Sequence, residues 1–116
     1  MKKYTGSCHC GKVRFEVETD LEKVISCNCS HCGRKGFLLN FVAPEQFTLL
    51  SGENEQTEYL FNKKNVHHLF CPVCGVESFA RGTNPDGTEK IAVNVRCFEN
   101  FDLESITPIA VNGKDF

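Results

Sequence analysis

The sequence lacks several features that would place it in other classes of protein. It contains no tryptophan, one methionine and four prolines among 116 residues. No apolar run approaches the roughly 20 residues that a membrane-spanning helix needs, so no membrane partner is expected. The segment from Met1 to Gly6 holds no apolar stretch of the kind found in signal peptides. The sequence therefore predicts a cytoplasmic protein.

Positive charge is also scarce. Lysine and arginine total 13 against 15 aspartates and glutamates, which gives a formal net charge of −2. Nucleic-acid-binding proteins usually present a basic face, so nucleic acid is not expected as a partner. The apolar fraction of 41% is that of an ordinary folded domain, and the length favours one domain over residues 1–116. Both a monomer and a homodimer are compatible with this composition.

Short segments of alternating or mostly apolar residues, separated by turn residues, predict a mostly β fold. Residues 12–18 alternate apolar and charged side chains, which is typical of a strand with one buried face. Further strands are expected at 37–43, 46–50, 57–61, 66–70, 76–81 and 90–96. Turn signals lie at 62–65, 84–87 and 112–113. Residues 99–103 are expected to form one helical turn.

Aromatic and histidine side chains in these strands are expected to serve mainly the core. The ten phenylalanines include Phe41, Phe70 and Phe79, which are predicted to be buried, although one ring could line a pocket. His67 and His68 are consecutive in an expected strand, so one should face inward and the other outward. A structural role is the expectation for the inward one.

Eight cysteines are the most informative feature of the sequence. Without a signal peptide, clustered thiols are expected to bind metal rather than to form disulfides. The segment CPVCG at 71–75 is typical of a zinc knuckle, because its two sulfurs can reach one ion and the glycine suits a tight turn. A C-x-C pair also places two sulfurs on one face of an extended chain. Zinc is the expected metal, and iron is the alternative for an all-thiolate site.

The cysteines fall into blocks along the sequence: Cys8 and Cys10; Cys27, Cys29 and Cys32; Cys71 and Cys74; and Cys97 alone. The sizes of these blocks restrict how the cysteines can be divided between two sites with four ligands each. If every block stays intact, one site consists of Cys8, Cys10, Cys71 and Cys74. The other consists of Cys27, Cys29 and Cys32, completed by Cys97 or left with an open position. The first site would be structural, because four thiolates close the coordination shell of zinc. The second could be catalytic, since three protein ligands with an exchangeable fourth are typical of catalytic zinc.

Three segments resemble the glutathione-dependent formaldehyde-activating enzyme family, also called the centromere protein V-like family. They are GSCHCGKV at 6–13, CNCSHC at 27–32 and FCPVCG at 70–75, with further similarity at 94–97 and 112–114. The chain resembles a short member of this family. The resemblance implies a β-tent fold of several small coiled antiparallel sheets stapled by zinc. It also implies a structural zinc on the first set of cysteines and a second zinc on the block of three.

The resemblance implies an enzyme as well. The family activity is a carbon–sulfur lyase reaction that condenses formaldehyde with glutathione to S-(hydroxymethyl)glutathione. On this hypothesis the second zinc holds the thiol of glutathione beside the aldehyde. Arg34, Lys35 and Arg96 are the expected contacts to glutathione carboxylates, because they are near the ligand cysteines in sequence. Related chemistry on another small thiol or aldehyde remains open, and the rival function is a non-catalytic, zinc-stabilised interaction module.

Overall fold

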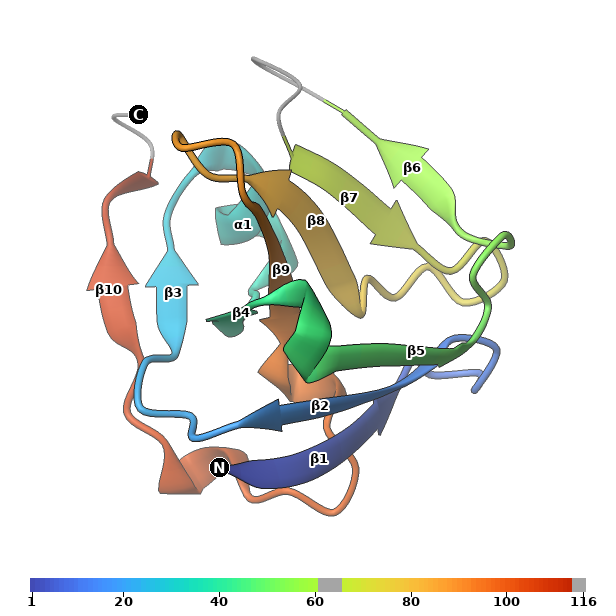
Figure 1. The fold of residues 1–116 in the computed structure, drawn as a ribbon, viewed down its shortest axis with the longest axis horizontal. Helices are drawn as coiled ribbons and strands as arrows, with labels where there is room; N and C mark the ends of the chain where they lie inside the picture. Colours follow the sequence, from blue (N-terminus) through green and yellow to red (C-terminus); the bar gives the residue numbers. More distant parts are fainter. Residues whose placement is uncertain (61–65, 114–116) are drawn as a thin grey trace.

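The computed structural model describes residues 1–60 and 66–113, and strands predominate in them (Figure 1). The strands are β1 (Lys2–Ser7), β2 (Arg14–Thr19), β3 (Ile25–Cys27), β4 (Leu39–Val42), β5 (Phe47–Ser51), β6 (Thr57–Tyr59), β7 (Val66–Phe70), β8 (Phe79–Thr83), β9 (Glu89–Asn94) and β10 (Ile109–Val111). The helical elements are α1 (Ser30–Lys35) and the short 3-10 helices η1 (Pro44–Gln46), η2 (Val95–Cys97) and η3 (Leu103–Ser105). The mostly β prediction is confirmed. In the described ranges no helix is long and apolar enough to cross a membrane.

The strands form two sheets. The smaller has the order β1-β2-β5, and the larger has the order β10-β3-β4-β9-β8-β7-β6. Figure 1 shows the small sheet along the lower side of the molecule and the larger one arching above it, from β10 on the left to β6 on the right. Strand neighbours run antiparallel except for β3 and β10, which are parallel. This parallel pair places the last described residues beside Cys27.

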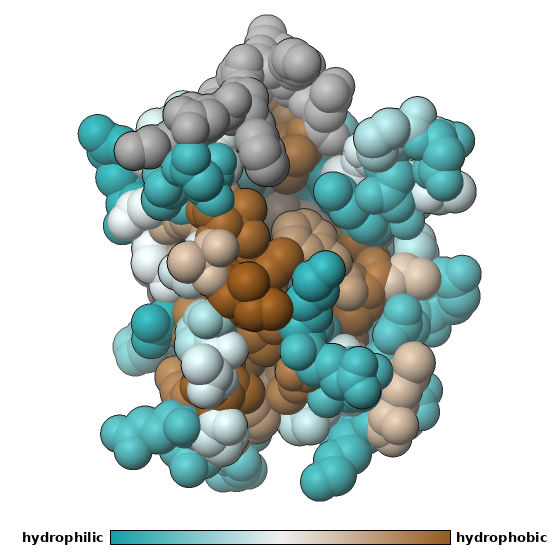
Figure 2. All heavy atoms as spheres, turned by 90° about the vertical axis from the view of Figure 1, so that its left-hand side faces the viewer, coloured by the Kyte–Doolittle hydropathy of each residue, from teal (hydrophilic) through white to brown (hydrophobic). Residues whose placement is uncertain are grey.

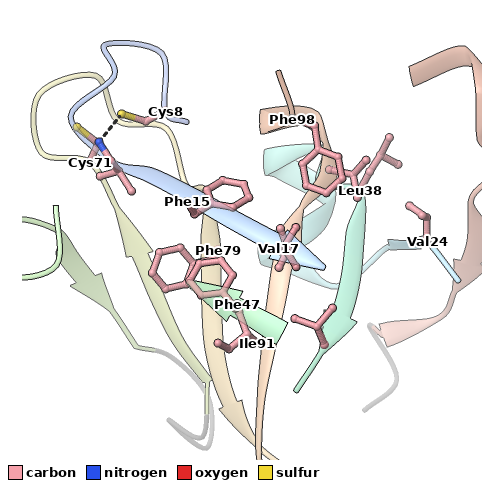
Figure 3. Packing of buried hydrophobic residues seen from close by; sticks show 14 residues of the cluster. Cys8, Phe15, Val17, Val24, Leu38, Phe47, Cys71, Phe79, Ile91 and Phe98 are labelled. Carbon is pink, nitrogen blue, oxygen red and sulfur yellow. Dashed lines mark hydrogen bonds between the residues drawn. The ribbon is translucent and has the colours of Figure 1, made fainter. Parts of the chain in front are cut away.

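The core lies where the two sheets face each other. Phe15 on β2 and Phe79 on β8 are fully buried, and the ring of Phe47 on β5 lies between them (Figure 3). Its centroid is 4.7 Å from that of Phe79 and 5.5 Å from that of Phe15. Cys8 and Cys71 lie at one end of the same buried cluster. The phenyl rings therefore pack the two sheets together, and Cys8 and Cys71 belong to the same buried core.

Seven predicted strands occur with bounds close to those expected, while β1, β3 and β10 were not predicted. Strand β1 lacks an alternating pattern, and β3 and β10 have three residues each, so long-range pairing rather than local pattern defines them. The helical turn expected at 99–103 is wrong. Short 3-10 helices form instead at 95–97 and 103–105, because the side chains of Asn94 and Asp102 accept hydrogen bonds from the Arg96 and Glu104 amides. The turn predicted at 62–65 lies outside the described residues.

Candidate metal centres and an adjoining cavity

The first cysteine cluster joins two turns that are distant in sequence. The sulfurs of Cys8, Cys10, Cys71 and Cys74 all lie within 4.8 Å of one another. The Sγ atom of Cys10 is 3.7 Å from that of Cys8 and 3.6 Å from that of Cys71. Cys8 and Cys71 are buried, whereas Cys10 is exposed. The structure thus brings together the four residues that the block count assigns to one site.

The cluster has two halves, Cys8 with Cys10 and Cys71 with Cys74, and the same backbone arrangement closes each of them. The Cys8 amide donates to the Val13 carbonyl at 2.9 Å, and the Cys71 amide donates to the Val76 carbonyl at 3.1 Å. The glycine directly after the second cysteine of each half has a φ of 84° or 78°, which favours a residue without Cβ. These turns aim both sulfurs of each half at a common centre.

Thiolate character is unevenly distributed in the first cluster. Burial opposes ionisation of Cys74, but hydrogen bonds from the Cys10 and Val76 amides and from neighbouring thiols outweigh it and lower its pKa to about 6. The Lys12 amide stabilises the Cys10 thiolate, but desolvation and hydrogen bonds with the other sulfurs raise its pKa to about 11. Sulfurs that share protons in this way suit a soft divalent cation, which replaces those protons. The donor set fits zinc.

The second cluster is built by α1. Cys27 ends β3, Cys29 is the N-cap of α1 and Cys32 lies within the helix, with their sulfurs within 4.8 Å of one another. The Cys29 sulfur accepts a hydrogen bond from the Cys32 amide at 3.3 Å. Sulfur thereby takes the capping role usually played by serine or aspartate, which explains why the helix was not predicted. Gly36, at φ 69° after the helix, was the signal that could have revealed its end.

The pKa values of Cys29 and Cys32 in the second cluster are shifted in opposite directions. Burial opposes ionisation of Cys29, but hydrogen bonds from the Cys32 and His31 amides and from neighbouring thiols lower its pKa. Burial raises the pKa of Cys32 far above its usual value, and hydrogen bonding and repulsion from Cys29 and Cys27 raise it further. Three closely spaced sulfurs again fit zinc as a donor set.

Cys97, which the sequence offered as a fourth ligand, lies elsewhere. Among the described residues, the group of sulfurs within 4.8 Å of one another at the second cluster consists of Cys27, Cys29 and Cys32, and it does not include Cys97. The segment that carries Cys97 is held to β1 by a bridge between Gly6 and Phe98 and by a 2.8 Å bond from the Glu99 amide to the Thr5 carbonyl. Burial, reinforced by charge on Cys8 and Cys74, raises the pKa of the Cys97 thiol to about 11.

The C-terminal segment packs directly on the second cluster. The Asn28 backbone amide donates to the Val111 carbonyl at 3.1 Å, and the Asn28 side-chain Nδ2 donates to the side-chain Oδ1 of Asn112 at 2.8 Å. A Cβ on Gly113 would lie 2.3 Å from the sulfur of Cys27. The sequence assigned Gly113 to a turn and gave no sign of this close approach.

A cavity of about 390 Å³ opens beside the second cluster. Its wall includes the three cysteines of that cluster, together with His68, Glu77 and Gly113. Phe41, which was expected in the core, is 42% exposed and lines this cavity. Phe79 is buried as expected, and Phe70 is half-buried. The outward face of β4 thus supplies a pocket wall rather than core packing.

Buried polar groups form one end of the cavity. His68 and Glu77 are both buried, and the Nδ1 atom of His68 is 3.1 Å from Oε2 of Glu77. The ring of His31, on α1, lies 4.1 Å from that of His68, and its Nε2 atom is 3.8 Å from Oε1 of Glu77. Burial lowers the pKa of His31, as does the proximity of His68. No sequence motif marked Glu77. Alternation along β7 correctly predicted that one of the two histidines faces inward, and the structure shows that it is His68.

The cations expected to contact glutathione are not among the described residues that line this cavity. Arg34 donates from Nη1 to the Ser30 carbonyl at 2.8 Å, and Lys35 Nζ lies 5.6 Å from the Phe70 ring centroid. Arg34 and Lys35 line a neighbouring hollow, which also includes Tyr59 and shares Glu77 with the cavity. Arg96 donates from Nε to the Gly36 carbonyl at 2.8 Å.

Fold and clusters together define a small, mostly β protein with two sets of cysteines suited to bind metal. Residues 3–112 match the family model described as glutathione-dependent formaldehyde-activating enzyme. The chain belongs to this family, as its sequence resemblance indicated. A similar solved structure is the crystal structure of a Rhodobacter sphaeroides protein from a structural genomics programme. It is 27% identical, has a TM-score of 0.79, and the match covers 91% of this chain and 97% of that one.

Proposed function

We propose that this protein is a zinc-dependent carbon–sulfur lyase that condenses formaldehyde, or a related small aldehyde, with glutathione or a similar thiol. The product is an S-hydroxymethyl adduct. The observation that carries the proposal is the group of three cysteine sulfurs on the wall of a cavity large enough for a small ligand. Family membership supports the same chemistry.

The two clusters take different roles in this proposal. Cys8, Cys10, Cys71 and Cys74 would hold a structural zinc, since four sulfurs complete its preferred tetrahedral set. Cys27, Cys29 and Cys32 would hold the second zinc. When bound there, zinc would supply a site that favours the thiolate form of a thiol ligand.

The remaining residues of the cavity position the reactants. Addition of a thiol to an aldehyde forms one carbon–sulfur bond, and the thiol proton finishes on the former carbonyl oxygen. The reaction is balanced without an oxidant or a further reactant. Glu77 accepts a hydrogen bond from Nδ1 of His68 and thereby fixes the orientation of the imidazole in the wall. Apolar residues around it exclude water and hold the thiol and the aldehyde together.

The test compares Cys29→Ser with Cys97→Ser in zinc-loaded protein. Adduct formation is followed by carbon-13 NMR with labelled formaldehyde and glutathione or another small thiol, with the uncatalysed rate subtracted. We expect Cys29→Ser to lose at least about 100-fold of the catalysed rate, because a ligand of the second site is altered. Cys97→Ser, whose sulfur lies outside that cluster, should retain the rate. Equal rates for Cys29→Ser and wild type, after correction for the folded fraction, would favour a non-catalytic zinc module.

A further inference from the structure

We infer that the thiol taken by this cavity carries an apolar body, such as a short alkyl or aryl group, rather than the charged peptide body of glutathione. The inference rests on the proposed function, because it assumes that a thiol binds at the second cluster. It concerns what surrounds the sulfur once the thiol is there.

Apolar side chains make up most of that wall. They project from strands on both sides of the cavity and from the segment after α1: Ile25, Phe37, Leu39, Phe41, Val66 and Ala92. The polar side chains of the described lining are the sulfur cluster, the adjacent pair of His68 and Glu77, and Lys90. A ligand that matches this distribution has one polar, sulfur-bearing end and an apolar remainder.

Two side chains of this wall are more exposed than their chemistry favours. Phe41 is 42% exposed and Val66 is 37% exposed. Figure 2 shows apolar residues gathered in the middle of the face that carries β10 and β3, with hydrophilic residues around them. Exposed apolar surface beside a cavity is a common sign of ligand binding, because a bound apolar group removes it from water.

The charges on the described residues of the cavity wall do not match glutathione. Glutathione carries two carboxylates, and each needs a cationic or hydrogen-bonding partner when it leaves water. Of the described residues that line the cavity, one is a lysine or arginine, namely Lys90. Its Nζ lies 5.1 Å from the Phe41 ring centroid. Glu77 adds a buried carboxylate to the same wall, which opposes a second negative group. Arg34 and Lys35, the expected partners, line not the cavity but the neighbouring hollow, which meets it at Glu77.

Direct binding to cobalt-substituted protein tests the inference without relying on turnover. Thiols that ligate cobalt change its visible spectrum, so dissociation constants can be measured for 2-mercaptoethanol, 1-butanethiol, benzyl mercaptan and glutathione. We expect affinity to rise on the order of tenfold for each two methylenes that enter the cavity. Benzyl mercaptan should bind at least tenfold more tightly than glutathione.

Phe41→Ala and Leu50→Ala form a matched pair of variants. Both replace a partly exposed apolar side chain, but Leu50, which is 52% exposed, does not line the cavity. Phe41→Ala should weaken benzyl mercaptan at least fivefold while leaving 2-mercaptoethanol unchanged, and Leu50→Ala should alter neither. Glutathione binding as tightly as benzyl mercaptan, or an equal effect of Phe41→Ala on all thiols, would overturn the inference alone. If no thiol changes the spectrum, the proposed function falls and this inference falls with it.

Discussion

Replacing Gly113 with alanine probes the contact between the C-terminal segment and the second cluster. The added Cβ would lie 2.3 Å from the Cys27 sulfur, whereas ordinary contacts begin near 3.4 Å, so the two atoms must separate by about 1 Å. Productive zinc–sulfur distances tolerate only about 0.2 Å. Retreat of the segment instead would strain the two hydrogen bonds that Asn28 makes to Val111 and Asn112.

We therefore expect Gly113→Ala to weaken zinc at the second cluster by about 10- to 100-fold, the range seen when groups supporting metal ligands are disturbed. Zinc at the first cluster should be unaffected, because its turns lie elsewhere in the fold. Competition with a chromogenic chelator resolves the two affinities as two steps.

Gly33→Ala is the matched control for this variant. Gly33 lies in α1 within the same ligand block, and its added Cβ would meet the Asn28 carbonyl oxygen at an ordinary 3.7 Å. Both zinc affinities should remain those of the wild type. If Gly113→Ala also leaves both affinities unchanged, the close packing of residue 113 on Cys27 does not position the ligand, and the reasoning is refuted.

Three further predictions concern stability. Cys71→Ser should lower the thermal midpoint of zinc-loaded protein on the order of 10 °C or more in calorimetry, because it removes a buried sulfur of the proposed structural zinc site; an unchanged midpoint would contradict this. Phe79→Ala should lower the free energy of unfolding, measured by urea denaturation, by about 3–5 kcal/mol, whereas Phe41→Ala should lower it by less than about 1 kcal/mol. Similar losses for the two variants would mean that Phe41 belongs to the core. Glu77→Ala should cost about 3 kcal/mol by the same method, since it leaves His68 buried without its carboxylate, and a cost below about 0.5 kcal/mol would show that the pair is not stabilising.

The arrangement of the cysteines could be predicted from sequence because it follows from spacing. Blocks with two, three, two and one cysteines leave few ways to form four-ligand sites, and turn chemistry holds each block together. The structure groups Cys8 and Cys10 with Cys71 and Cys74 in the same way. The strands with clear alternation, such as β2, were also predictable, because burial of one face imposes a period of two.

Other parts of the site depend on tertiary pairing that leaves no local pattern. The parallel pairing of β10 with β3 brings Gly113 to Cys27, although more than eighty residues separate the two strands in sequence. Helix α1 is capped by a cysteine sulfur, which no propensity scale favours. The meeting of His68 with Glu77 depends on how β7 and the segment before β8 pack around the cavity.

Zinc content together with the identity of the unliganded cysteine tests the central claim most directly. The claim is that this chain holds one closed site of four sulfurs and one site of three sulfurs that faces a cavity. Elemental analysis of zinc-loaded protein, with peptide mapping after prolonged alkylation at about pH 10, where a thiol with a pKa of about 11 begins to ionise, should give two zinc ions per chain and label at Cys97. One zinc per chain, or protection of Cys97 with label at Cys27, Cys29 or Cys32, would contradict it.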